Sequence, residues 1–120
     1  MQIDKLNKNI QYFILANNLT EWRRLQDLFF SLDVKWIYNK EKYFDGYPDH
    51  GKNIEFSYPK WMSIIYINNT NDEYDWVMTT DDYDYEKKIF PEKNKKILNY
   101  FTIMRYTKLE RLQKNSGDFS

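Results

Sequence analysis

The chain has 120 residues, with 18 basic and 18 acidic side chains and no cysteine. This length fits one domain around one apolar core, and the lack of cysteine excludes disulfides and thiolate-bound metal. Zero net charge argues against general nucleic-acid or membrane binding, and no apolar run reaches the length of a membrane span, so we expect a single cytoplasmic domain over residues 1–120.

The beginning of the chain predicts a strand followed by an amphipathic helix. Residues 10–16 (IQYFILA) are apolar on both faces, which indicates a strand inside a sheet. Asn18 and Glu21 have the spacing of a capping box. Apolar residues then recur every three or four positions, so a helix is predicted near 19–32, with Gln26 on the side opposite the apolar stripe.

The middle of the chain predicts four more strands around an irregular loop. Residues 34–38 (VKWIY) have strand composition. Residues 39–60 contain two glycines and two prolines, and are predicted as an irregular loop with a short strand near 53–58. Residues 61–67 (WMSIIYI) predict a central strand. Residues 74–79 alternate between apolar and polar, so they complete a hairpin with one apolar and one wetter face.

The last part of the chain predicts a long helix. Pro91 fits a first helical turn, and apolar residues follow it at helical spacing: Ile97, Leu98, Phe101, Met104, Leu109 and Leu112. We therefore predict a helix near 91–114 and a frayed tail at 115–120. The order of elements predicts an α+β domain, in which a small antiparallel or mixed sheet has its helices packed on one face.

Acidic side chains are concentrated in residues 72–86, here termed the acidic segment. It holds seven carboxylates and no Lys or Arg, whereas residues 87–114 hold nine basic residues and two acids. Such crowding suits a solvated sheet edge, contact with the chain's own basic helix, or contact with a basic partner. In the third interpretation the partner-binding residues are Asp75, Asp81, Asp82, Tyr83, Asp84, Tyr85 and Glu86.

The loop at 39–60 is rich in aromatic residues and holds the single histidine of the chain, His50. It is either a flap over one face of the sheet or a recognition loop, including the lid of a small-ligand pocket. The ligand or partner contacts would then be Tyr43, Phe44, Tyr47 and His50. Asp45 and Asp49 lie near His50, but their spacing matches no known metal-ligand pattern, so we predict no metal and no cofactor.

Lysines cluster at the predicted start of the last helix, where the helix dipole disfavours positive charge. They are Lys87, Lys88, Lys93, Lys95 and Lys96. This face is either solvated or in contact with nucleic acid or an acidic partner. The predicted helix is also longer than one small sheet can cover, so part of its apolar stripe would stay exposed. A second copy of the chain could cover that part, which makes the pattern compatible with a homodimer.

Enzymatic motifs are sparse. Neither a glycine-rich phosphate loop nor a nucleophile elbow occurs in the chain. The one catalytic candidate is Glu86-x-Lys88 with Asp72 or Asp75 upstream, a pattern in which metal-dependent nucleases hold Mg²⁺ and activate water. We predict a non-enzymatic binding protein, and keep small-ligand or nucleotide binding and nuclease activity as alternatives.

The chain resembles short accessory proteins of low-GC phages and prophages. The resemblance rests on the strand at 10–16, the amphipathic helix, the tryptophan-containing segment at 34–36 that follows the helix, and the aromatic hairpin at 61–78. Asp33, where a glycine is common, and the long basic second helix depart from this pattern. The resemblance implies a protein of the host cytoplasm, in a class that includes anti-CRISPR-like inhibitors of bacterial defence, and no catalytic residue. With the acidic segment, it predicts occlusion of a basic surface on a host protein or protein–nucleic acid complex, rather than direct nucleic-acid binding.

Overall fold

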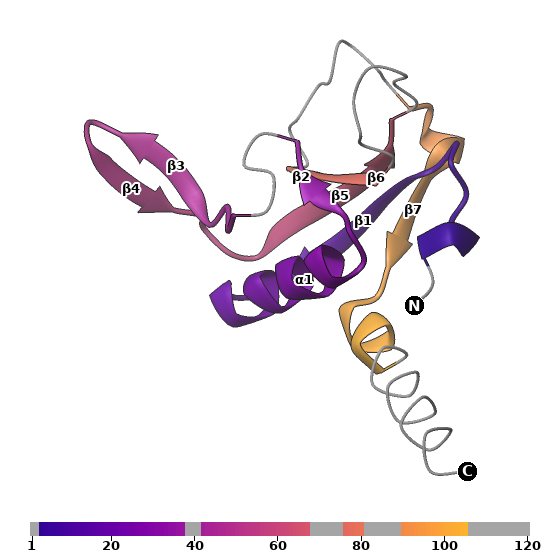
Figure 1. The fold of residues 1–120 in the computed structure, drawn as a ribbon, viewed down its shortest axis with the longest axis horizontal. Helices are drawn as coiled ribbons and strands as arrows, with labels where there is room; N and C mark the ends of the chain where they lie inside the picture. The colour runs from indigo at the N-terminus through magenta and orange to yellow at the C-terminus, as the bar shows by residue number, and fades with distance from the viewer. Residues whose placement is uncertain (1–2, 38–41, 68–75, 81–89, 106–120) are drawn as a thin grey trace.

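The computed structural model describes residues 3–37, 42–67, 76–80 and 90–105. A five-stranded mixed sheet forms the body, a helix packs on one face, and a separate two-stranded hairpin projects from it (Figure 1). The strands are β1 (Gln11–Ala16), β2 (Lys35–Trp36), β3 (Gly46–Asp49), β4 (Lys52–Glu55), β5 (Lys60–Tyr66), β6 (Trp76–Thr80) and β7 (Lys95–Leu98). Helix α1 spans Leu19–Ser31, 3-10 turns span Ile3–Lys5 and Glu92–Asn94, and residues 100–105 are helical.

The sheet has the strand order β2-β6-β5-β1-β7, so β5 is central, as predicted. Strand β5 pairs antiparallel with both β1 and β6, whereas β7 is parallel to β1 and β2 is parallel to β6. This mixed sheet confirms the predicted α+β class. The predicted pairing of 61–67 with 74–79 is also confirmed, with Tyr66 opposite Trp76.

Helix α1 begins and ends with signals that are visible in the sequence. The Asn18 side chain accepts a hydrogen bond from the Glu21 backbone N–H at 2.9 Å, and the Glu21 carboxylate accepts one from the Asn17 backbone N–H at 3.1 Å. At the other end, Asp33 has a φ of 62°, the left-handed conformation that favours glycine. The predicted capping is confirmed, and Asp33 occupies a glycine-like conformation.

Two apolar clusters cover the two faces of the sheet. The larger one lies between α1 and the sheet, and its members include Ile14, Trp22, Phe29, Ile64 and Met78. The smaller one, on the other face, consists of Ile65, Ile67, Val77 and Phe90. Strand β6 is consequently buried on both faces. The prediction that its second face is wetter is wrong, because Phe90 belongs to the cluster that covers Val77.

The prediction of one continuous helix near 91–114 is wrong. Residues 92–94 form a 3-10 turn, and β7 follows, paired parallel with residues 11–14 of β1. Hydrogen bonding to this free strand edge outweighs the helical spacing of the apolar residues. The helical segment begins only after Asn99, whose side chain accepts a hydrogen bond from the Thr102 backbone N–H at 3.0 Å.

The late helix start changes the surroundings of several predicted residues. Lys95 and Lys96 lie on an edge strand, where lysine is common, and not at a helix N-terminus. Phe101 of the predicted apolar stripe is 62% exposed, whereas Tyr100 and Ile103 are buried in the core. Met104 of the stripe packs against the core, so the stripe coincides with the buried face of this helix only in part. Its continuation beyond residue 105 lies outside the described residues.

The loop predicted at 39–60 contains regular structure. Strands β3 and β4 pair antiparallel from Gly46 opposite Glu55 to Asp49 opposite Lys52. The short strand predicted near 53–58 is thus found at 52–55, with a partner that was not predicted. Of the strand predicted at 34–38, residues 35 and 36 form β2, and residue 38 lies outside the described residues. None of the helices in the described ranges has the length and apolar character that a bilayer crossing requires.

Candidate functional site

The hairpin of β3 and β4, residues 46–55, is here termed the arm. It projects from the five-stranded sheet (Figure 1). All four residues of β4 and three of the four in β3 are exposed. A two-stranded hairpin is only marginally stable in water without further packing. The fold therefore has to hold the arm at its base.

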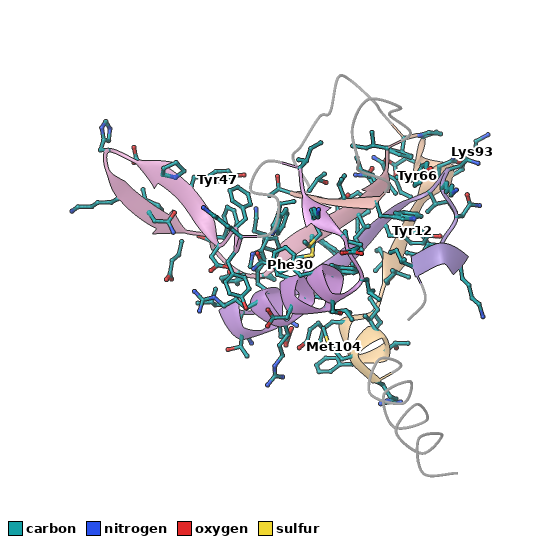
Figure 2. The ribbon with its side chains drawn as sticks, in the orientation of Figure 1. Tyr12, Phe30, Tyr47, Tyr66, Lys93 and Met104 are labelled. Carbon is teal, nitrogen blue, oxygen red and sulfur yellow. The ribbon has the colours of Figure 1, made fainter. Side chains whose placement is uncertain are left out.

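Aromatic side chains support that base. Phe56 follows β4 directly, and its ring packs edge-on against Phe44 at 5.2 Å and Tyr47 at 4.9 Å between centroids. Trp22 of α1 lies 5.5 Å from Phe56, and Trp36 of β2 lies 5.3 Å from Phe44. The cluster joins the arm to the core of the domain. Two predicted contact residues, Phe44 and Tyr47, are thus brought together, with Tyr47 at the body end of the arm (Figure 2).

A buried glutamine of α1 adds polar support at the same place. Gln26 is fully buried, and its side-chain amide donates to Asp45 Oδ1 at 2.8 Å. Its carbonyl oxygen accepts hydrogen bonds from the Trp36 indole N–H and the Phe44 backbone N–H, each at 2.8 Å. These three hydrogen bonds, here termed the Gln26 clamp, tie α1 and β2 to the residues before β3.

No local pattern in the sequence predicts this role for Gln26. Helical periodicity separates the apolar stripe from the other side of the helix, but it does not show what packs against that other side. The partners of Gln26 lie 10, 18 and 19 residues further along the chain. A single glutamine carries no local signal for contacts at such separations.

Charged groups border the Gln26 clamp on its solvent side. The Arg23 guanidinium lies 2.9 Å from Asp45 Oδ2, and the hydrogen bond and charge of Asp45 raise the pKa of Arg23. The Tyr43 hydroxyl donates a hydrogen bond to Asp27, and this bond, together with burial, raises the pKa of the Tyr43 phenol. Arg23 therefore stays charged and Tyr43 stays neutral at physiological pH. The predicted residue Tyr43 thus lies against α1.

The arm displays an apolar pair to solvent. Tyr47 and Ile54 are directly opposite each other in the strand register, so their side chains lie on the same face of the hairpin. Their exposed fractions are 44% and 54%. Ile54 was not predicted as a contact residue, although its position between the polar residues Asn53 and Glu55 gives a strand-like alternation that could have identified it.

The tip of the arm is a two-residue turn. His50 and Gly51 have φ values of 47° and 80°, the pair of left-handed conformations found in a type I′ turn. The His50 side chain is 95% exposed, with Nε2 3.4 Å from Asp49 Oδ1. The structure therefore places His50 apart from the aromatic base. In the described part of the chain, no cluster of three or more metal-ligating side chains occurs.

The partner-binding residues predicted in the acidic segment, Asp75 and residues 81–86, lie outside the described residues, as do the nuclease candidates Asp72 and Lys88. These assignments stay predictions. No protein-family model, curated protein or solved structure matches the chain. The function of the arm therefore has to be inferred from its own contacts, exposure and charge.

Proposed function

We propose that the protein is a non-enzymatic binding protein that docks onto another protein through the arm. The observation that carries this proposal is the exposed Tyr47–Ile54 pair on a hairpin whose base the Gln26 clamp holds. The Tyr47 ring contacts Phe56 at the base of the arm, yet 44% of Tyr47 and 54% of Ile54 stay open to solvent on a projecting element. Tyrosine is enriched among the few side chains that supply most of the binding energy at an interface, and burial of the exposed surface of Ile54 by a partner adds to it.

The fixed base of the arm favours tight binding. A flexible element loses conformational entropy when it docks, and an element already held in its bound conformation avoids part of that loss. The Gln26 clamp and the aromatic cluster around Phe56 provide this support. Exposed charges of both signs flank the apolar pair, with Asp49 and Lys52 on the same face of the hairpin and Glu55 on the other. A protein surface with an apolar hollow and a mixed polar rim complements such an element.

The acidic segment supplies a second contact in this proposal. Its seven carboxylates, without a Lys or Arg among them, favour a basic region on the same partner. The resemblance to phage accessory proteins supports a bacterial defence complex as that partner, and inhibition by occlusion as the outcome. The two contacts can be tested separately, because different substitutions alter the arm and the acidic segment.

Replacing Tyr47 and Ile54 together by serine is expected to abolish partner retention when the protein is used as affinity bait in bacterial lysate. Truncation of an interface anchor costs about 2 kcal/mol or more, so the double variant should bind at least about a hundredfold more weakly. Phe101→Ser is the control, because it removes an apolar side chain that is more exposed than either member of the pair and lies away from the arm. If the natively folded double variant retains the same proteins as wild type, the arm is not the docking element.

Charge reversal of Asp81, Asp82 and Asp84 to lysine is expected to abolish the same retention and to leave the thermal unfolding transition unchanged. Attraction to a basic partner surface becomes repulsion. Circular dichroism measures folding, and quantitative affinity capture measures binding. If this variant still retains the partner, the acidic segment is not a contact surface, and the proposed contact through the arm is unaffected.

A further inference from the structure

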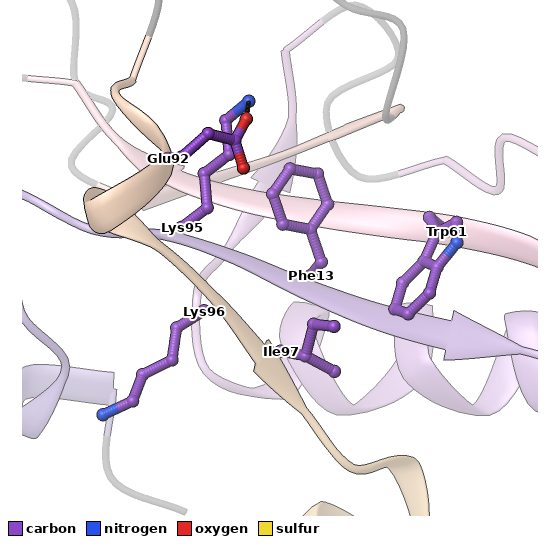
Figure 3. Close-up of a pocket in the computed structure, with 6 residues that line it drawn as sticks. All are labelled: Phe13, Trp61, Glu92, Lys95, Lys96 and Ile97. Carbon is purple, nitrogen blue, oxygen red and sulfur yellow. Dashed lines mark hydrogen bonds and ion pairs between the residues drawn. The ribbon is translucent and has the colours of Figure 1, made fainter.

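The face of the sheet opposite α1 carries a shallow groove. Tyr12 and Ile14 of β1 pack toward α1, so strand alternation places Phe13 on the opposite face. The rings of Phe13 and Trp61 meet edge-on there, with centroids 6.4 Å apart. Together with Ile97 of β7 they line a groove of about 420 Å³ (Figure 3).

The groove opens beside a free strand edge. Within the described residues, β7 is the last strand of the sheet and pairs only with β1. The outer edge of such a strand presents backbone N–H and C=O groups that can pair with an added extended chain. Ile97 is 68% exposed, more than any other large apolar side chain that the structure describes. An added strand would cover both this side chain and the backbone edge.

Positive charge surrounds this edge. Lys95 lies 3.1 Å from Glu92, but no carboxylate of the described residues lies within ion-pair distance of Lys93 or Lys96. Lys95 and Lys96 point to opposite sides of β7 (Figure 3). A strand added here therefore meets positive charge on both of its faces. Like charges opposed across strands are destabilising, so the lysines disfavour a second copy of β7 and favour an acidic strand.

We propose that the free edge of β7 binds an extended acidic peptide of a partner protein, with one apolar side chain of the peptide in the groove. Backbone hydrogen bonds to β7 align the peptide. Carboxylates on its two faces pair with Lys95 and Lys96, and an aromatic or branched aliphatic side chain contacts Phe13, Trp61 and Ile97. This surface lies on the five-stranded sheet and is independent of the arm, so it adds a second recognition element to the protein.

The probe is a fluorescent hexapeptide of five glutamates with valine as its third residue, which carries carboxylates on both faces of an extended strand and one apolar side chain. Its binding is measured by fluorescence anisotropy. Lys95→Glu combined with Lys96→Glu is expected to weaken its binding about tenfold or more, because two attractions become repulsions. Lys5→Glu combined with Lys52→Glu is the control: it changes net charge equally at exposed lysines elsewhere and keeps wild-type affinity. Equal weakening by both double variants would show a net-charge effect only and would overturn the proposal.

The backbone part of the proposal has its own test. Two further peptides carry N-methyl groups on alternate amides, in the two complementary patterns. Only one set of amides faces the edge of β7, so one peptide is expected to lose binding and the other to keep it. Equal binding of both would rule out strand addition. Sedimentation of the protein alone as a dimer that Ile97→Thr dissociates would assign the edge to a second copy, and would likewise overturn the proposal.

Discussion

Replacement of Gln26 by leucine is expected to lower the free energy of unfolding by about 4 kcal/mol. Leucine fills a similar volume but removes all three hydrogen bonds of the Gln26 clamp. The Trp36 indole N–H and the Phe44 backbone N–H then lose their acceptor, and each such buried donor costs about 1–3 kcal/mol. Urea unfolding followed by tryptophan fluorescence measures the change, which is a large part of the stability of a domain this size.

Two further variants test whether the loss of stability comes from the lost hydrogen bonds of the Gln26 clamp. Arg24→Leu makes a polar-to-leucine change at an exposed position of α1, and should shift the unfolding midpoint only slightly. Gln26→Glu keeps an acceptor for Trp36 and Phe44 but places a carboxylate against the Asp45 carboxylate. Its unfolding should therefore depend on pH, with stability recovered when one carboxyl is protonated. A leucine variant as stable as wild type would show that the Gln26 clamp contributes nothing to folding.

The elements predicted correctly are those whose signals lie within a few residues. Asn18 and Glu21 define the start of α1 through contacts made inside its first turn. The apolar run at 61–67 identifies β5 as central because it is apolar on both faces. In each case the local preference and the tertiary surroundings agree, so the sequence alone suffices.

The wrong predictions arise where a distant segment decides the structure. Residues 95–98 have helix-compatible spacing, yet they pair with residues 11–14, far earlier in the chain. Asn99 carries the local signal for the later helix start, because it is a favourable N-cap for the residues that follow. Without knowledge that β1 has a free edge, the periodic stripe from Ile97 onward favours one helix.

The arm shows the same limit at the candidate site. Its turn uses His50 and Gly51 rather than the Asn-Gly or Asp-Gly pairs that mark a hairpin most strongly. The aromatic residues Phe44 and Tyr47 were recognised as contact residues from composition, but their grouping around Phe56 depends on α1 and β2. The residue types of the site were therefore predictable, whereas its geometry was not.

Replacement of Gly46 by alanine is expected to detach the base of the arm and to lower the free energy of unfolding by about 3 kcal/mol. An alanine Cβ at this position would lie 2.1 Å from the Ile54 carbonyl oxygen and 2.9 Å from the Glu55 Cα. Both obstacles are backbone, so no side-chain rotation relieves the clash. The pairing of Gly46 with Glu55 and the adjacent hydrogen bond from the Phe56 N–H to the Asp45 carbonyl, 2.8 Å long, would open.

Gly51→Ala in the same hairpin is the matched control for Gly46→Ala. Gly51 has a φ of 80°, but no atom lies within 4 Å of the added Cβ, so only the left-handed backbone opposes alanine there, at a cost of about 1–2 kcal/mol. Hydrogen exchange should therefore show lost protection across residues 46–55 for Gly46→Ala, with partner retention lost as well. For Gly51→Ala, faster exchange should be confined to the turn. Equal effects of the two substitutions would mean that close strand approach at Gly46 does not hold the arm, and that its base is carried by the Gln26 clamp and the ring of Phe56 alone.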